Sequence, residues 1–164
     1  MPADPIEFRI VKSLQAALKT ISTASGYHYT VQGLAVKLDP EHKVEELIPG
    51  ADPPFGPPRP WMVLDVSASA SYGYFPSNQR RGDMPFTLHI IHDSDVVDDD
   101  AKLKTFFRLV ADGEQALAVD IARGGLAVDT VITGRTMRDN EGQEVWAQLV
   151  GHVRYHSEYG KPNG

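Results

Sequence analysis

The stretch that decides the fold is Glu144-Val-Trp-Ala-Gln-Leu-Val-Gly-His-Val-Arg-Tyr155, in which apolar and polar residues alternate. Successive side chains on a strand point to opposite faces, so this stretch predicts a β-strand. One face would carry Val145, Ala147, Leu149, Val153 and Tyr155, and the other Trp146, Gln148, His152 and Arg154. A second β-rich segment spans residues 126–136, and turn-forming residues at 138–142 join the two. Together they predict a C-terminal hairpin.

Two segments upstream have the period of an amphipathic helix. In the first, apolar residues recur at three- and four-residue spacing from Ile6 to Ile21, and Ser25-Gly26 ends the pattern. The second opens on Asp98-Asp99-Asp100, whose carboxylates suit a helix N-terminus, and runs to the glycines at 124–125. Gly113 interrupts it, which predicts a kink or two consecutive helices.

Three further segments predict strands. Residues 61–66 are apolar at nearly every position, which is typical of a strand covered on both faces. Residues 86–91 contain another alternating run. Residues 27–39 also alternate, but their phase slips at Gly33, which predicts a long strand bent by a bulge there.

The remaining stretches predict loops. Seven of the twelve prolines lie in residues 40–60, so we expect a long loop there with one helical turn at 44–47. Residues 67–85 are small and polar, with aromatic residues set among them, and predict a second long loop or hairpin tip. The tail, from about residue 157 to 164, should be loose.

These elements predict an α+β fold. Two main helices would pack on a mostly antiparallel or mixed β-sheet. The 164 residues suit one domain, because a domain usually takes roughly 100–200 residues.

Composition narrows the classes of partner. There are 16 Lys and Arg against 22 Asp and Glu, and the acidic excess lies in residues 83–164. This balance argues against specific nucleic-acid binding, which needs a basic face. Cysteine is absent, which excludes disulfides and thiolate metal sites. No apolar run approaches the roughly 20 residues that span a bilayer, so we expect a soluble protein without a membrane partner.

The sequence offers one metal-like cluster, His89-x-x-His92-Asp93. Residues three apart on a strand point to opposite faces, so both histidines could share an ion only if the strand ended between them. Neither a nucleotide-binding glycine motif nor a nucleophile elbow occurs. We therefore predict no catalytic residues, no metal ligands and no cofactor. A small metal-dependent enzyme using His89, His92 and Asp93 is the less favoured alternative.

An interaction surface is the more informative hypothesis. Aromatic residues and arginine are the types enriched at protein–protein hot spots. The candidate contact residues are Tyr72, Tyr74, Phe75, Arg80 and Arg81 in the 67–85 stretch, with Trp146 and Arg154 on the hairpin. In the alternative interpretation, the aromatic side chains fold back over the sheet edge.

The order of elements resembles one known family. An opening helix reads Ile6-Glu-Phe-Arg-Ile-Val-Lys-Ser-Leu-Gln-Ala-Ala-Leu18, and a tyrosine-bearing strand and the apolar strand 61–66 follow it. A basic loop, an acid-capped helix and a hairpin ending in Val150-Gly-His-Val-Arg-Tyr155 complete the series. Over residues 6–156 this series is similar to bacteriophage tail terminator proteins, also called tail completion proteins.

The resemblance implies a structural role in the virion tail, after production in the host cytoplasm. Such a protein forms a homo-oligomeric ring, expected to be a hexamer, that caps the tail tube and halts its polymerisation. The ring then offers a docking surface to the head–tail connector or neck protein, and phage DNA passes its lumen without specific binding. The 67–83 segment would face the tube or the lumen. A different head–tail joining or neck subunit is the related alternative.

Overall fold

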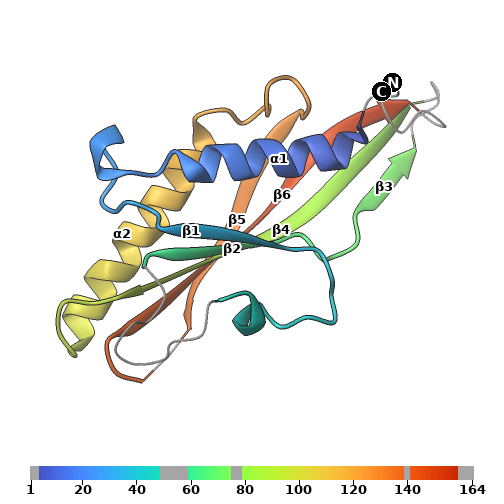
Figure 1. Ribbon diagram of the computed structural model, residues 1–164. Helices are drawn as coiled ribbons and strands as arrows, with labels where there is room; N and C mark the ends of the chain where they lie inside the picture. The colour runs from blue at the N-terminus through green and yellow to red at the C-terminus, as the bar shows by residue number, and fades with distance from the viewer. Residues whose placement is uncertain (1–3, 49–58, 75–78, 139–140, 159–164) are drawn as a thin grey trace.

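The computed structural model describes residues 4–48, 59–74, 79–138 and 141–158. It has two main helices and a six-stranded sheet (Figure 1). In chain order the elements are α1 (Ile6–Lys19), η1 (Thr23–Ser25), β1 (Gly33–Lys37), η2 (Val44–Leu47), β2 (Trp61–Asp65), β3 (Ser71–Tyr74), β4 (Gln79–Asp93), α2 (Asp99–Ala118), β5 (Asp129–Arg138) and β6 (Glu144–Glu158), where η1 and η2 are short 3-10 helices.

The sheet is mixed. Its strand order is β1-β2-β4-β6-β5, and β3 pairs with β4 beside this path. The β1–β2 pair is parallel, and the pairs that β4 makes with β2, β3 and β6, like the β5–β6 pair, are antiparallel. The expected α+β fold with a mostly antiparallel, mixed sheet is confirmed.

Both main helices lie on one side of the sheet, which we call the helix face (Figure 1). The core forms there, from the buried stripes of α1 and α2 and from alternate residues of β2, β4 and β6. The opposite side is the far face, and η2 lies against it beside β1 and β2. As the apolar run predicted, residues 62–64 of β2 are buried.

The first helix follows its sequence pattern closely. Ile6, Ile10, Leu14 and Leu18 are buried and face the core, because their spacing places them on one side of α1. The helix ends at Lys19, two residues before the end of the apolar pattern. Gly26 follows η1 with a φ of 87°, a left-handed conformation that glycine adopts without strain.

The second helix differs from its prediction at two points. It continues through Gly113 without a break, and a Cβ built on Gly113 would lie 2.7 Å from Leu149 Cδ1, so the glycine lets α2 pack closely on β6. It also ends at Ala118 rather than near residue 124. The buried Arg123 side chain donates to the Leu117 carbonyl, one of the last turn's free acceptors, and so stabilises this earlier end.

The predicted long strand over residues 27–39 is wrong in its first half, because only Gly33–Lys37 forms β1. The reason is Asp112 on α2, which is 1% exposed. Its carboxylate accepts hydrogen bonds from the backbone N–H groups of His28, at 2.9 Å, and Tyr29, at 3.0 Å. These amides are therefore satisfied by a side chain instead of a strand ladder.

Of the two predictions for residues 67–85, a long loop or a hairpin tip, the structure favours the hairpin, because β3 and β4 pair antiparallel there. Residues 71–74 form β3, and residues 79–85 already belong to β4, while 75–78 lie outside the described residues. The missing side chain of Gly82 makes room for a tyrosine of β6: Gly82 lies opposite Tyr155, and a Cβ on it would come within 2.2 Å of Tyr155 Cζ. In the 40–60 stretch, the expected helical turn at 44–47 is confirmed as η2, and residues 49–58 lie outside the description.

The C-terminal hairpin is confirmed, with its first strand shifted along the chain and its second strand longer than predicted. β5 starts three residues later than predicted and contains an irregularity between Ile132 and Gly134. β6 continues to Glu158, so residues 157 and 158 belong to the sheet instead of the expected loose tail. Residues 159–164 lie outside the described residues.

Candidate interaction surface

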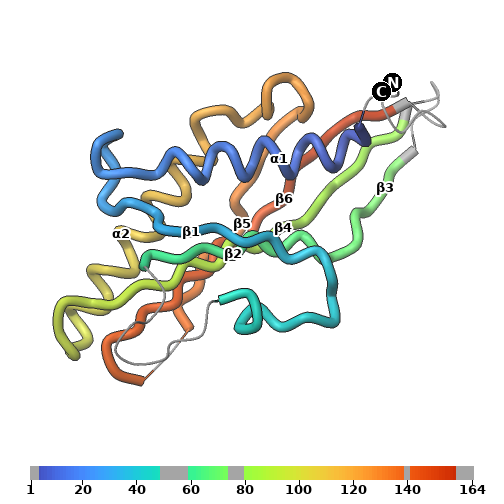
Figure 2. The backbone as a smooth tube through the Cα atoms, viewed as in Figure 1, coloured from blue at the N-terminus to red at the C-terminus, as the bar shows by residue number. Residues whose placement is uncertain are grey.

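The start of α1, β3, the start of β4 and the end of β6 gather at one end of the molecule (Figure 2). There Tyr72 of β3 is 43% exposed, and the guanidinium carbon of Arg80 lies 3.9 Å from the centre of its ring. The Tyr72 hydroxyl donates to Glu7 Oε1 at 3.3 Å. We call Glu7, Tyr72, Arg80 and Tyr155 the Tyr72–Arg80 cluster.

Glu7 anchors this cluster to the core. Its Oε1 accepts a hydrogen bond of 2.6 Å from the hydroxyl of Tyr155, whose side chain is fully buried. Burial, and then the hydrogen bond to Glu7, raise the pKa of Tyr155, so the phenol keeps the proton it donates. Arg80 Nη2 lies 3.9 Å from the same carboxylate oxygen. Tyr72 and Arg80 are thus held in place while the Tyr72 ring stays accessible.

Arg81 and Arg154 lie on the far face, opposite the Tyr72–Arg80 cluster. Arg81 Nη2 is 3.7 Å from Asp83 Oδ1. Arg154 donates two hydrogen bonds to the Asp129 carboxylate, one from Nη2 to Oδ2 and one from Nε to Oδ1, the latter 2.7 Å long. This hydrogen bond lowers the pKa of Asp129 and raises that of Arg154. The ion pair ties β5 to β6, so the predicted contact residues are divided between two faces.

Trp146 does not fit its expected role as an exposed contact, because it is 4% exposed. Its Nε1 donates to His89 Nδ1 at 3.1 Å, and the Arg138 guanidinium lies 4.5 Å from its ring centre. Arg138 in turn binds Glu45 of η2 at 2.6 Å. The sequence pattern places Trp146 on the polar side of β6, but η2 and Arg138 cover that side.

The Tyr74 backbone pairs with Arg80 at the end of β3. Phe75 lies outside the described residues.

The metal-like cluster of the sequence is dispersed in the fold. His89 points to the far face, where it accepts the Trp146 hydrogen bond, and burial lowers its pKa. His92 points to the helix face and packs edge-on against Tyr29, 4.6 Å between ring centres. Asp93 pairs with Arg59 at 2.8 Å. The strand spacing predicted these opposite directions. Within the described ranges, no three His, Asp or Glu side chains gather as a metal site would require.

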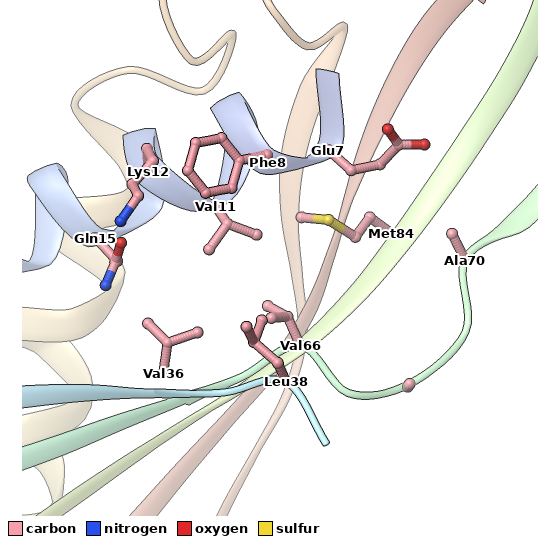
Figure 3. A pocket seen from close by; sticks show the side chains of 11 residues that line it. Glu7, Phe8, Val11, Lys12, Gln15, Val36, Leu38, Val66, Ala70 and Met84 are labelled. Carbon is pink, nitrogen blue, oxygen red and sulfur yellow. The ribbon is translucent and has the colours of Figure 1, made fainter. Parts of the chain in front are cut away.

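Sequence reasoning missed an apolar groove between α1 and the end of β1. It has a volume of about 390 Å³, and Figure 3 shows Phe8 and Val11 of α1 across from Val36, Leu38 and Val66. Phe8 is half exposed and lies off the buried stripe of α1. A large apolar residue outside the buried stripe was the only sign of this groove that the sequence pattern of α1 offered.

Comparison with protein-family models and with curated proteins finds no match for this chain. In the part of the chain that the structure describes, no helix combines the length and apolar character needed to cross a membrane.

Proposed function

We propose that this protein is a structural subunit of a bacteriophage tail that forms a ring, caps the tail tube and ends its polymerisation. The observation that carries the proposal is the Tyr72–Arg80 cluster. Interface hot spots favour tyrosine and arginine, and binding costs less entropy when such side chains are held in place beforehand. Here an exposed tyrosine ring and an arginine are fixed to a buried anchor at one end of the sheet.

The proposal assigns partners to the ring. The Tyr72–Arg80 cluster meets the tail tube protein, and another surface of the ring binds the head–tail connector or neck protein. Each subunit also binds its own copies, with a hexamer as the expected ring. The acidic balance of the second half of the chain lets phage DNA pass the lumen without specific binding. The assembled protein belongs to the virion tail, and catalysis plays no part in this role.

Substitution of Tyr72 tests the proposal. Tyr72→Ala removes the exposed ring, so purified variant should cap tail tubes at least about tenfold less effectively than wild type in electron micrographs of tube ends. Its unfolding midpoint should change little, because the ring is exposed. Tyr72→Phe keeps the ring under Arg80 and should retain capping.

Arg108→Ala is a matched control for Arg80→Ala, because both arginines are partly exposed and Arg108 lies on α2, outside the cluster. It should leave capping unchanged, whereas Arg80→Ala should weaken it. Full capping by Tyr72→Ala would contradict the proposed surface. Binding to the neck protein alone, with no capping by wild type, would instead favour the head–tail joining alternative.

A further inference from the structure

The described part of the sheet ends in an unpaired strand on each side. β1 and β5 are the two ends of the strand order. Lys37 accepts a backbone hydrogen bond from Val66 on the β2 side, so in a parallel register the backbones of Leu34 and Val36 point to the free edge. An open edge is a template for pairing with another strand.

An exposed apolar surface lies beside each open edge. Next to β1 is the α1 groove, formed by Phe8, Val11, Val36, Leu38 and Val66, in which Leu38 is 69% exposed. Next to β5 is a surface that we call the α2 ridge, formed by Leu103, Phe107 and Met137, all exposed.

The contacts of Arg135 show that the α2 ridge lies beside the β5 edge. This β5 residue lies 5.8 Å from the centre of the Phe107 ring and 3.9 Å from Glu114 on the same side of α2. Met137 follows two residues later on the same face of β5. The α1 groove and the α2 ridge are both on the helix face of the sheet.

We propose that copies of this chain associate head to tail, with the β5 edge and the α2 ridge of one copy seated on the β1 edge and the α1 groove of the next. This inference deepens the proposed function and rests on it, because it names the surfaces that build the ring. The strand directions suit the contact. β5 runs opposite to β1, so a neighbour with its helix face on the same side continues the sheet with an antiparallel pair.

Charge favours a second copy as the occupant of the groove. Exposed acids Asp39 and Glu41 follow β1, whereas β5 has no acid from Thr130 to Arg138 and carries the exposed Arg135 beside the ridge. Arg138 lies over Trp146 and binds Glu45 of its own copy, so it is not counted at this edge. Arg135 of one copy can therefore meet the acids that follow β1 in the next copy. A small apolar ligand in the groove would leave the open backbone of β1 unpaired, while a strand from another copy would satisfy it.

A stable contact between copies needs more surface than the strand edges alone supply. A stable interface covers about 800 Å² on each partner, involving about 20–30 residues. The five-residue β1 edge alone is too short for this, but the groove wall of α1 and the whole outer side of β5 enlarge it. Because the two surfaces differ, the contact is heterologous and repeats from copy to copy until a ring closes.

Three charged substitutions at exposed positions test this arrangement. Leu38→Glu alters the groove, Phe107→Glu alters the ridge, and Val119→Glu is the control, since Val119 is 78% exposed and lies in neither surface. Circular dichroism and unfolding midpoints confirm that each variant folds. By size exclusion with light scattering, wild type and Val119→Glu should assemble alike, and each of the other two should associate at least about tenfold more weakly.

Mixing the two weakened variants gives the decisive result. One intact ridge then meets one intact groove, so the mixture should form a one-to-one dimer and nothing larger. A monomeric wild type, unaltered assembly of either single variant, or a mixture without dimer would overturn the inference.

Tube capping separates this inference from the proposed function. If wild type assembles through these surfaces but caps no tube, the inference stands and the proposed function fails. If wild type and both variants cap tubes equally, the function stands and the inference fails.

Discussion

At the scale of single residues, the His89–Trp146 pair shows how the far face tolerates a buried imidazole. Trp146 Nε1 donates to His89 Nδ1, so that nitrogen must carry no proton. Burial lowers the pKa of His89 below its ordinary value of 6.5, and burial lowers that of His92 as well. Both side chains are therefore held neutral by the fold.

This arrangement predicts acid sensitivity. A histidine whose pKa is lowered in the folded state binds fewer protons there than in the unfolded chain, so it destabilises the fold as pH falls below about 6.5. The free energy of unfolding, measured with denaturant, should decrease from pH 7 to about 5.5. His89→Asn should reduce that decrease, because an amide oxygen accepts the Trp146 hydrogen bond at either pH.

His42→Asn, at an exposed position, is the control for the substitution itself, and it should change the free energy of unfolding at pH 7 by less than about 0.5 kcal/mol. An equal fall in stability for wild type and His89→Asn would contradict the assignment of His89 as a neutral acceptor.

At the scale of elements, the spacing of apolar residues along the chain predicted the helix and the strand that bury one regular face. The spacing of Ile6, Ile10 and Leu14 was sufficient for α1, and the alternation over 144–155 was sufficient for most of β6. Residues 27–32 alternate as well, yet Asp112, more than eighty residues away, accepts the backbone N–H groups of His28 and Tyr29. No pattern within the segment carries that information.

The candidate surface was also predictable only in part: its residue types could be chosen from the sequence, but their contacts could not. Tyr72 and Arg80 could be chosen because their residue types suit interfaces, but their link to Glu7 depends on α1 returning to the same end of the sheet. Trp146 was misplaced because η2, contributed by the proline-rich stretch, covers it from a distant part of the sequence.

Asp112 is the strongest test of this tertiary control of the 27–32 segment. Asp112→Ala leaves two backbone N–H groups without their acceptor, so unfolding in denaturant should show a loss of about 3 kcal/mol. Asp112→Asn should cost less, because its amide oxygen still accepts one of these bonds.

Glu114→Ala, on the exposed side of α2, is the matched control and should change stability by less than about 0.5 kcal/mol. A change as small for Asp112→Ala would show that residues 27–32 are held by other contacts.

At the scale of the whole molecule, the sheet separates two faces, and its described part has two open edges. The helix face holds the core together with the α1 groove and the α2 ridge near the two open edges. The Tyr72–Arg80 cluster occupies one end and adjoins the α1 groove, because Glu7 belongs to the cluster and also lines the groove. A ring closed through its edges would carry the cluster beside each contact between subunits, at the end that we propose meets the tube.

Negative-stain electron microscopy of the purified protein, alone and with its tail tubes, tests the central proposal most directly. We expect closed rings in the sample alone, and a single ring on the end of each tube, with tubes no longer lengthening. Separate subunits at every concentration, together with tubes that grow as they do without the protein, would contradict it.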